Sequence, residues 1–188
     1  GHEHRMGFLE TAVAEWDRCL PQCASLFVTV DGSQADAERV AERLHPWTGS
    51  IFRVGRPAFS GDMDNEHRLG VAANKNTGLE LLMGVPQIEH LFLSDDDCWP
   101  KIPQALDKHM DMTYKGIALP HSLVMWGRSR LSGVDNYLAQ WSWPRGVMMY
   151  AHRDVITRVG GMDERMVNAH EHAEWSNRIH NAGFTPAP

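Results

Sequence analysis

Three consecutive aspartates, Asp95, Asp96 and Asp97, follow the apolar run 88–94, which is typical of a buried strand. Ligands of open α/β sheets bind at the carboxyl ends of strands, so these acids lie where a site is expected. Three adjacent carboxylates repel one another, and Mg²⁺ or Mn²⁺, which prefer oxygen ligands, would compensate their charge. Because alternate residues of extended backbone point the same way, Asp95 and Asp97 could share one ion. The alternative is a solvated acidic turn before the next helix.

A second group, His170, Glu171 and His172, opens the last expected helix. A carboxylate or an imidazole can remove a proton from a hydroxyl, so the pair Glu171 and His172 is a candidate general base, with either member as the acceptor. A zinc-protease helix would require histidine four residues after His170, and that position is Glu174. The alternative is a plain helix terminus, where Glu171 interacts with the helix dipole.

Lys75 and Asn76, in the segment AANKNTG, are candidates for contacting a phosphorylated ligand. The ammonium of Lys75 could bind a diphosphate, and Asn76 could bond a ribose or a base. The alternatives are an exposed helix lysine and an asparagine that caps a helix or turn.

Tryptophans and an arginine gather in the tract 127–146, which has no clear periodicity. Trp141 and Trp143 are candidates for stacking on a sugar ring, as is Trp175 further on, although burial in a core is the usual alternative. Arg145 could reach a phosphate or an acceptor. This tract is therefore expected to cover a ligand.

The composition of the 188-residue chain (21.2 kDa) is that of a single globular domain, 1–188. A net charge of −6 argues against a general attraction to nucleic acid. No apolar run is long enough to span a membrane, and three cysteines without metal-finger spacing argue against a disulfide framework. These features favour a soluble, cytoplasmic protein.

Periodicity predicts helices over 8–20, 34–44, the second half of 68–84, and 102–112. It also predicts a helix after the apolar run 146–151 and a last helix that starts at 172 and ends at Gly183. Apolar runs predict strands near 25–30, 50–56, 88–94 and 146–151, and the segment 115–126 indicates a strand that leads into a loop. Alternating strands and helices predict an α/β fold with a mostly parallel sheet and helices on both faces.

Taken together, the motifs of this chain resemble the family 2 glycosyltransferases of the GT-A fold, a Rossmann-like architecture. The matching segments are the DDD triplet, VTVDGS, GVAANKNTGLELL, RGVMMYAHRDVITRVGGMDERM and HEHAEWSNRIHNAGF. The resemblance covers residues 5–184. It implies transfer of a sugar from a nucleotide-diphosphate sugar, a UDP-sugar first of all, to an acceptor hydroxyl, with inversion by direct displacement. The acceptor could be a saccharide, a lipid carrier, a protein or a modified nucleic acid.

The resemblance also assigns roles to matching positions. It implies that Asp31 contacts the nucleotide, that Asp95 and Asp97 hold Mn²⁺ or Mg²⁺ and the diphosphate, and that Asp96 belongs to the donor site. Where the family has an acidic pair, Glu-Asp, this chain has Glu171 and His172, so the departure falls on the base itself.

Two other functions remain open at this point. A phosphoryl-transfer hydrolase would use a strand-end aspartate as nucleophile, and a sugar- or nucleotide-binding module would need no base. The resemblance further predicts that the domain lacks a first strand and a C-terminal segment, or that a partner, such as a second copy in a homo-oligomer, completes the site.

Overall fold

The computed structural model describes residues 2–22, 24–31, 34–45, 51–54, 70–114, 117–118, 121–125, 131–135, 138–141, 146–166 and 170–184. Helices in these ranges are α1 (His2–Cys19), α2 (Gln34–Leu44), α3 (Val71–Met83), α4 (Gln104–Met110), α5 (Arg153–Val159) and α6 (Glu171–Asn181). Strands are β1 (Ser25–Val28), β2 (Ile51–Val54), β3 (His90–Ser94), β4 (Thr113–Tyr114), β5 (Ile117–Ala118), β6 (His121–Met125), β7 (Leu131–Asp135), β8 (Leu138–Trp141) and β9 (Gly146–His152).

The helices follow the apolar periodicity of the sequence. In α2, Ala37, Val40 and Leu44 recur at intervals of three and four residues, and all three are buried. Its bounds coincide with the predicted helix 34–44. Helix α1 begins earlier than predicted, at His2. None of the described helices combines the length and the hydrophobicity needed to cross a bilayer.

The strands do not form the expected sheet, and the prediction of a mostly parallel, Rossmann-like GT-A sheet is wrong. Strand β9 lies between β3 and β6 and pairs with both in antiparallel fashion, with Leu91 opposite Ala151 and Leu123 opposite Met149. The short pairs β4–β5 and β7–β8 are antiparallel as well, and among the described pairings only β1–β2 is parallel. The described residues also contain more helix than strand.

The physical reason lies in the connections between strands. Parallel neighbours require a crossover segment, usually a helix, whereas antiparallel neighbours can follow one another through hairpins. Strands β6 and β9 are separated along the chain by the β7–β8 hairpin, which lies in the tract for which no periodicity was evident. The alternation of strands and helices that predicted a parallel sheet does not extend through this part of the chain.

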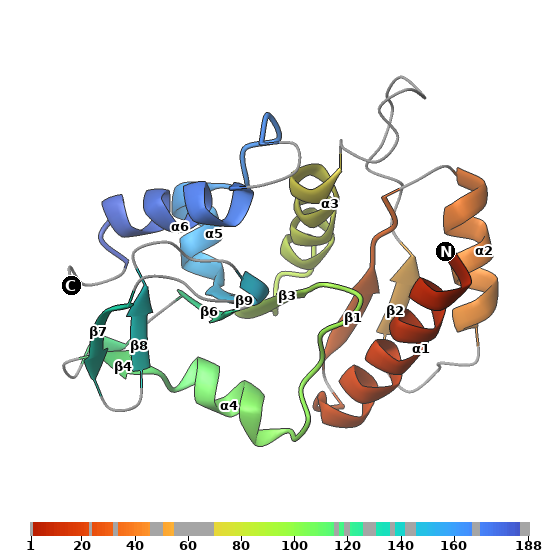
Figure 1. Cartoon of the computed structure of the whole chain (residues 1–188), viewed down its shortest axis with the longest axis horizontal. Helices are drawn as coiled ribbons and strands as arrows, with labels where there is room; N and C mark the ends of the chain where they lie inside the picture. The colour runs from red at the N-terminus through yellow and green to blue at the C-terminus, as the bar shows by residue number, and fades with distance from the viewer. Residues whose placement is uncertain are drawn as a thin grey trace.

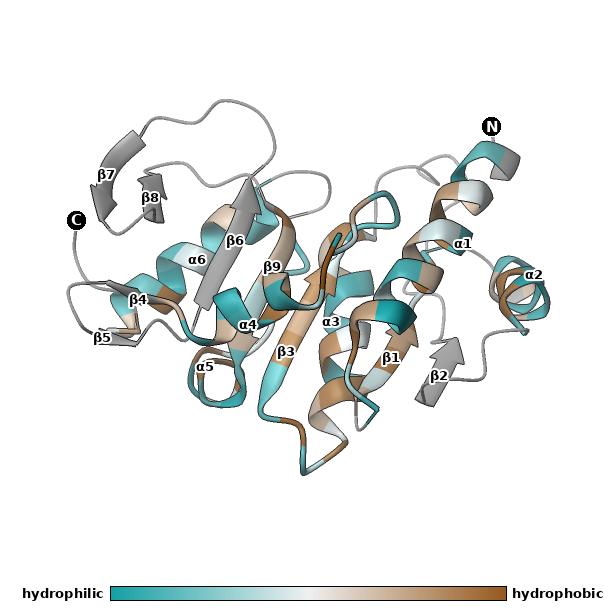
Figure 2. Cartoon of the chain, turned by 90° about the horizontal axis from the view of Figure 1, so that it is seen from below, coloured by the Kyte–Doolittle hydropathy of each residue, from teal (hydrophilic) through white to brown (hydrophobic). Residues whose placement is uncertain are grey.

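Strand β3 is the centre of the packing, because its two faces are buried against different helices (Figure 1). Leu91 and Leu93 point into a core formed with α3, α5 and α6, while Phe92 packs against Trp16 of α1 on the other face. A third cluster joins α1, β1 and α2 through residues that include Val28. Figure 2 shows the hydrophobic residues concentrated on β1, β3 and α3, the elements that surround the site described next.

Candidate functional site

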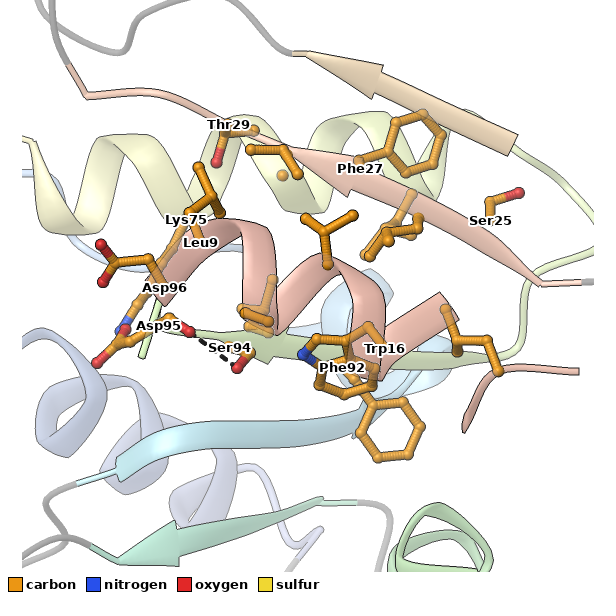
Figure 3. Close-up of a pocket in the computed structure, with 18 of the residues that line it drawn as sticks. Leu9, Trp16, Ser25, Phe27, Thr29, Lys75, Phe92, Ser94, Asp95 and Asp96 are labelled. Carbon is orange, nitrogen blue, oxygen red and sulfur yellow. Dashed lines mark hydrogen bonds and ion pairs between the residues drawn. The ribbon is translucent and has the colours of Figure 1, made fainter. Parts of the chain in front are cut away.

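A cavity of about 1520 Å³ lies between α1, β1, α3 and the carboxyl end of β3 (Figure 3). Most of its wall is apolar, with contributions from Trp16, Val28 and Phe92. Its polar lining includes several residues that the sequence singled out, namely Asp31, Lys75, Asp95, Asp96, Glu171 and His172. Tertiary structure therefore gathers most of the predicted donor-binding residues and both candidate bases around one space.

The aspartate triplet occupies a turn. The backbone N–H of Asp95 still donates to Val147 O of β9 (3.0 Å), but the Cys98 N–H donates back to Asp95 O (3.1 Å), which closes the turn. The alternation expected of extended backbone is lost here, and Asp95 and Asp97 have different partners. Asp95 contacts Lys75, whereas Asp97 contacts Arg5.

Lys75 is held in the cavity wall by α3, and its side chain is only 12% exposed. Its Nζ lies 3.2 Å from Asp95 Oδ1 and 3.8 Å from Glu171 Oε1, and Figure 3 shows it pointing toward Asp95. The alternative of an exposed helix lysine does not describe this side chain. A single ammonium thus lies between the end of β3 and the start of α6.

Arg5 of α1 is a site residue that the sequence analysis missed. Its guanidinium forms an ion pair with Asp96 and lies 3.6 Å from Asp97 Oδ2. Burial, together with the charges of Asp97 and Asp95, raises the pKa of Asp96, although Arg5 acts against this rise. No local signal could have revealed the contact, because Arg5 and Asp96 are 91 positions apart in the sequence.

Glu171 and His172 form a hydrogen-bonded pair at the first turn of α6. The distance between Glu171 Oε1 and His172 Nδ1 is 3.0 Å, and Glu171 is 4% exposed. Burial alone would raise the pKa of Glu171, but hydrogen bonds from His172 and from the backbone N–H of Glu171, with the charges of His172 and Lys75, bring the pKa below its ordinary value. Glu171 is therefore a buried carboxylate that stays ionised at neutral pH.

The residue before this pair has an unusual backbone. His170, the N-cap of α6, has φ 74° and ψ −4°, in the left-handed region, and within the described residues it is the single non-glycine residue with positive φ. Such a conformation costs an ordinary L-residue about 1–2 kcal/mol. It sets the direction in which α6 starts, and so the placement of Glu171 and His172 at the cavity.

Asp31 follows β1 and lies against Gly70, the N-cap of α3. A Cβ added to Gly70 would fall 1.8 Å from Asp31 Oδ2, so a glycine is needed for this approach. Partial burial raises the pKa of Asp31. Two hydrogen bonds join the end of β1 to α3. The side chains of Thr29 and Asn74 each donate to the backbone carbonyl of the other residue.

Asn76 lies at the contact between α3 and the turn after α5. Its Nδ2 donates to Met162 O and to Glu164 Oε1, both at 2.9 Å, and its Oδ1 accepts from the Met162 N–H at 2.7 Å. Asn76 therefore ties α3 to the turn after α5, and it is not part of the cavity lining. These bonds give Asn76 a structural role, and its predicted contact with a nucleotide stays a prediction.

The tryptophans divide into two groups. Trp175 is fully buried and donates from Nε1 to Gly160 O (2.9 Å), so it is a core residue with a satisfied polar atom. Trp143 and Arg145 lie outside the described residues, as does the side chain of Trp141, whose backbone ends β8. Their predicted contacts with a sugar or a phosphate stay predictions.

The donor atoms at the end of β3 suit a hard divalent cation. Within the described part of the chain, no three His, Cys, Asp or Glu residues are grouped to hold a metal by themselves. Mg²⁺ sites, however, often use one or two carboxylates and take further oxygens from substrate phosphates and water. Asp95 and Asp97, with side chains 37% and 45% exposed, supply carboxylate oxygens of this kind, which in the structure contact Lys75 and Arg5.

Comparisons with known proteins return no match: no family model, curated protein or solved structure matches this chain. The functional interpretation rests on the residues of the site.

Proposed function

We propose that this protein is a metal-dependent glycosyltransferase that moves a sugar from a nucleotide-diphosphate sugar to an acceptor hydroxyl. One observation carries the proposal: Lys75 lies between Asp95 and Glu171, at 3.2 Å and 3.8 Å, in the wall of a single cavity. Such a transfer needs a charged site for the diphosphate next to a base for the acceptor. Lys75 connects residues suited to each of these tasks.

The donor half of the proposed site consists of Asp31, Lys75 and the aspartate turn. Asp95 and Asp97 would hold Mn²⁺ or Mg²⁺, which supplies a Lewis acid that stabilises the leaving diphosphate when bound. Lys75 would bind a diphosphate oxygen through its ammonium, and Asp31 would bond the nucleotide. The largely buried position of Lys75 strengthens such a contact, because screening by water is reduced there.

The acceptor half consists of Glu171 and His172. A base in this pair would remove the hydroxyl proton of the acceptor as its oxygen attacks the anomeric carbon, giving inversion by direct displacement. The acceptor is a saccharide, a lipid carrier, a protein or a modified nucleic acid. A UDP-sugar is the first donor to test.

The test combines Mn²⁺ with a panel of nucleotide sugars and measures both the release of nucleoside diphosphate and the thermal shift on binding. We expect release that is lost in Asp97→Ala and in the double variant Glu171→Ala, His172→Ala. A metal-dependent thermal shift without turnover on any acceptor would instead identify a binding module. Phosphate release from simple monoesters would identify a phosphoryl-transfer hydrolase and overturn the proposal.

A further inference from the structure

We propose that His172 is the general base of this site and that Glu171 is its positioning residue, which holds the imidazole with Nδ1 protonated and Nε2 free. The proposal rests on the proposed function and assigns separate roles to two residues that the sequence left as alternatives. It follows from the burial and hydrogen bonding of the pair.

Glu171 is poorly suited to act as the base itself. Its side chain is 5% exposed, its Oε1 is bonded to His172, and Lys75 Nζ lies 3.8 Å from the same oxygen. Protonation would neutralise the carboxylate and so weaken its contacts with both His172 and Lys75.

His172 has the more accessible side chain, 16% exposed, and it belongs to the cavity lining. An ionised carboxylate is only a hydrogen-bond acceptor, so the 3.0 Å contact requires His172 Nδ1 to be the donor. A neutral imidazole has one protonated nitrogen, and Nε2 is therefore the nitrogen with a free lone pair. The carboxylate selects the tautomer that can accept a proton at the cavity.

Lys75 supports this arrangement from α3. Its ammonium adds to the hydrogen bonds from His172 and from the backbone that favour the ionised form of Glu171, and it also faces Asp95 at the end of β3. When His172 gains a proton, the neighbouring carboxylate stabilises the imidazolium by a charge-assisted hydrogen bond. Enzymes with activated nucleophiles use the same arrangement, in which a third group orients the general base.

In the resulting step, the acceptor oxygen forms a bond to the anomeric carbon while its proton moves to His172 Nε2. The bond between the anomeric carbon and the diphosphate oxygen breaks, and its electron pair leaves with the nucleoside diphosphate. The proton on His172 is later released to water, which restores the neutral imidazole.

The experiment measures kcat and KM for transfer in His172→Ala and Glu171→Gln, with His180→Ala as the control. His180 is an exposed histidine on the same helix. We expect His172→Ala to lower kcat by about 10²-fold or more, with KM for the donor changed little, and added imidazole to restore part of the rate. Glu171→Gln should lower kcat by a similar factor, because its amide can donate to Nδ1 and favour the opposite tautomer. His180→Ala should behave as the wild type.

A second measurement reads the tautomer directly. ¹⁵N NMR of the histidine side chains should show His172 protonated at Nδ1 in the wild type and at Nε2 in Glu171→Gln. Glu171→Asp, which keeps the acceptor, should restore the wild-type tautomer and part of kcat. If Glu171→Gln does not fold, the wild-type and Glu171→Asp spectra still test the assignment.

The outcomes separate this proposal from the proposed function. Transfer by the wild type that survives His172→Ala, or a wild-type imidazole protonated at Nε2, would overturn the assignment of His172 while the glycosyltransferase stands. A wild type that transfers no sugar would overturn the glycosyltransferase and with it the role of His172 as base. The NMR measurement would still decide whether Glu171 sets the tautomer.

Discussion

Lys75 Nζ lies 3.2 Å from Asp95 Oδ1, and this ion pair joins α3 to the turn at the end of β3. The same ammonium is 3.8 Å from Glu171 Oε1 at the start of α6, so one positive charge faces acids from two separate elements. Lys75 is largely shielded from water, as is Glu171. Removing the ammonium of Lys75 would therefore leave the buried carboxylate of Glu171 with less compensating positive charge. The first prediction follows from this geometry.

Lys75→Met is expected to lower the release of nucleoside diphosphate by about 10²-fold, since a charged group at the leaving phosphate is lost. The variant should also have a lower Tm, because Glu171 keeps its charge and loses part of its compensation. The matched control is Lys108→Met, a lysine on the exposed face of α4, which should change neither quantity. Wild-type release by Lys75→Met would contradict the donor role of this residue.

Asn76→Ala is expected to reduce stability and not donor binding. The substitution removes two bonds to the backbone of Met162 and one to Glu164, which we expect to cost about 2–3 kcal/mol of unfolding free energy. Urea unfolding measures this loss, with Asn177→Ala on the exposed face of α6 as the control. A weaker affinity for the nucleotide sugar at unchanged stability would instead support the contact with the nucleotide predicted from the sequence.

The pH dependence of stability should reveal the ionised state of Glu171. Its pKa in the folded protein is below the ordinary value of 4.5, so ionisation of this group stabilises the fold above pH 4.5. That contribution is lost as the pH falls through the lower, folded pKa. Glu171→Gln cannot titrate, so the stability of the wild type relative to this variant should decrease on acidification below pH 4.5. The denaturant midpoints of both proteins, measured across this pH range, test this expectation. A stability advantage of the wild type that grows on acidification would contradict it.

His170 offers a test of the strained start of α6. With φ at 74°, glycine should be tolerated there better than any β-branched residue. We expect His170→Gly to be more stable than His170→Val by at least about 1–2 kcal/mol. Both variants lose the imidazole, so the difference between their unfolding free energies isolates the backbone. Equal stabilities would show that α6 can start in another conformation.

Local patterns predicted many of the elements, although not the β7–β8 hairpin. The helix over 34–44 has the bounds expected from Ala37, Val40 and Leu44, and the apolar run before Asp95 is strand β3. These features depend on the periodicity of neighbouring residues, which is written in the sequence. The same locality identified Glu171 and His172 as a pair.

The partners of the site residues could not be predicted in this way. Arg5 meets Asp96 across 91 positions, Asn76 meets Met162 across 86, and Lys75 meets Glu171 from a different helix. Such contacts depend on how separate elements pack. The structural contacts of Asn76 could not be predicted, because its local surroundings say nothing of the turn after α5.

The sequence by itself therefore determined the helices and strands that its periodicity marks, such as α2 and β3, and which residue types are available for chemistry at their ends. It did not determine the β7–β8 hairpin. Only the tertiary structure decided that β9 runs antiparallel to β3, since strand direction depends on the connections between strands. It also decided that Lys75 faces both Asp95 and Glu171, because α3 and α6 both pack against the β3 side of the core, and the ends of these elements meet at one cavity.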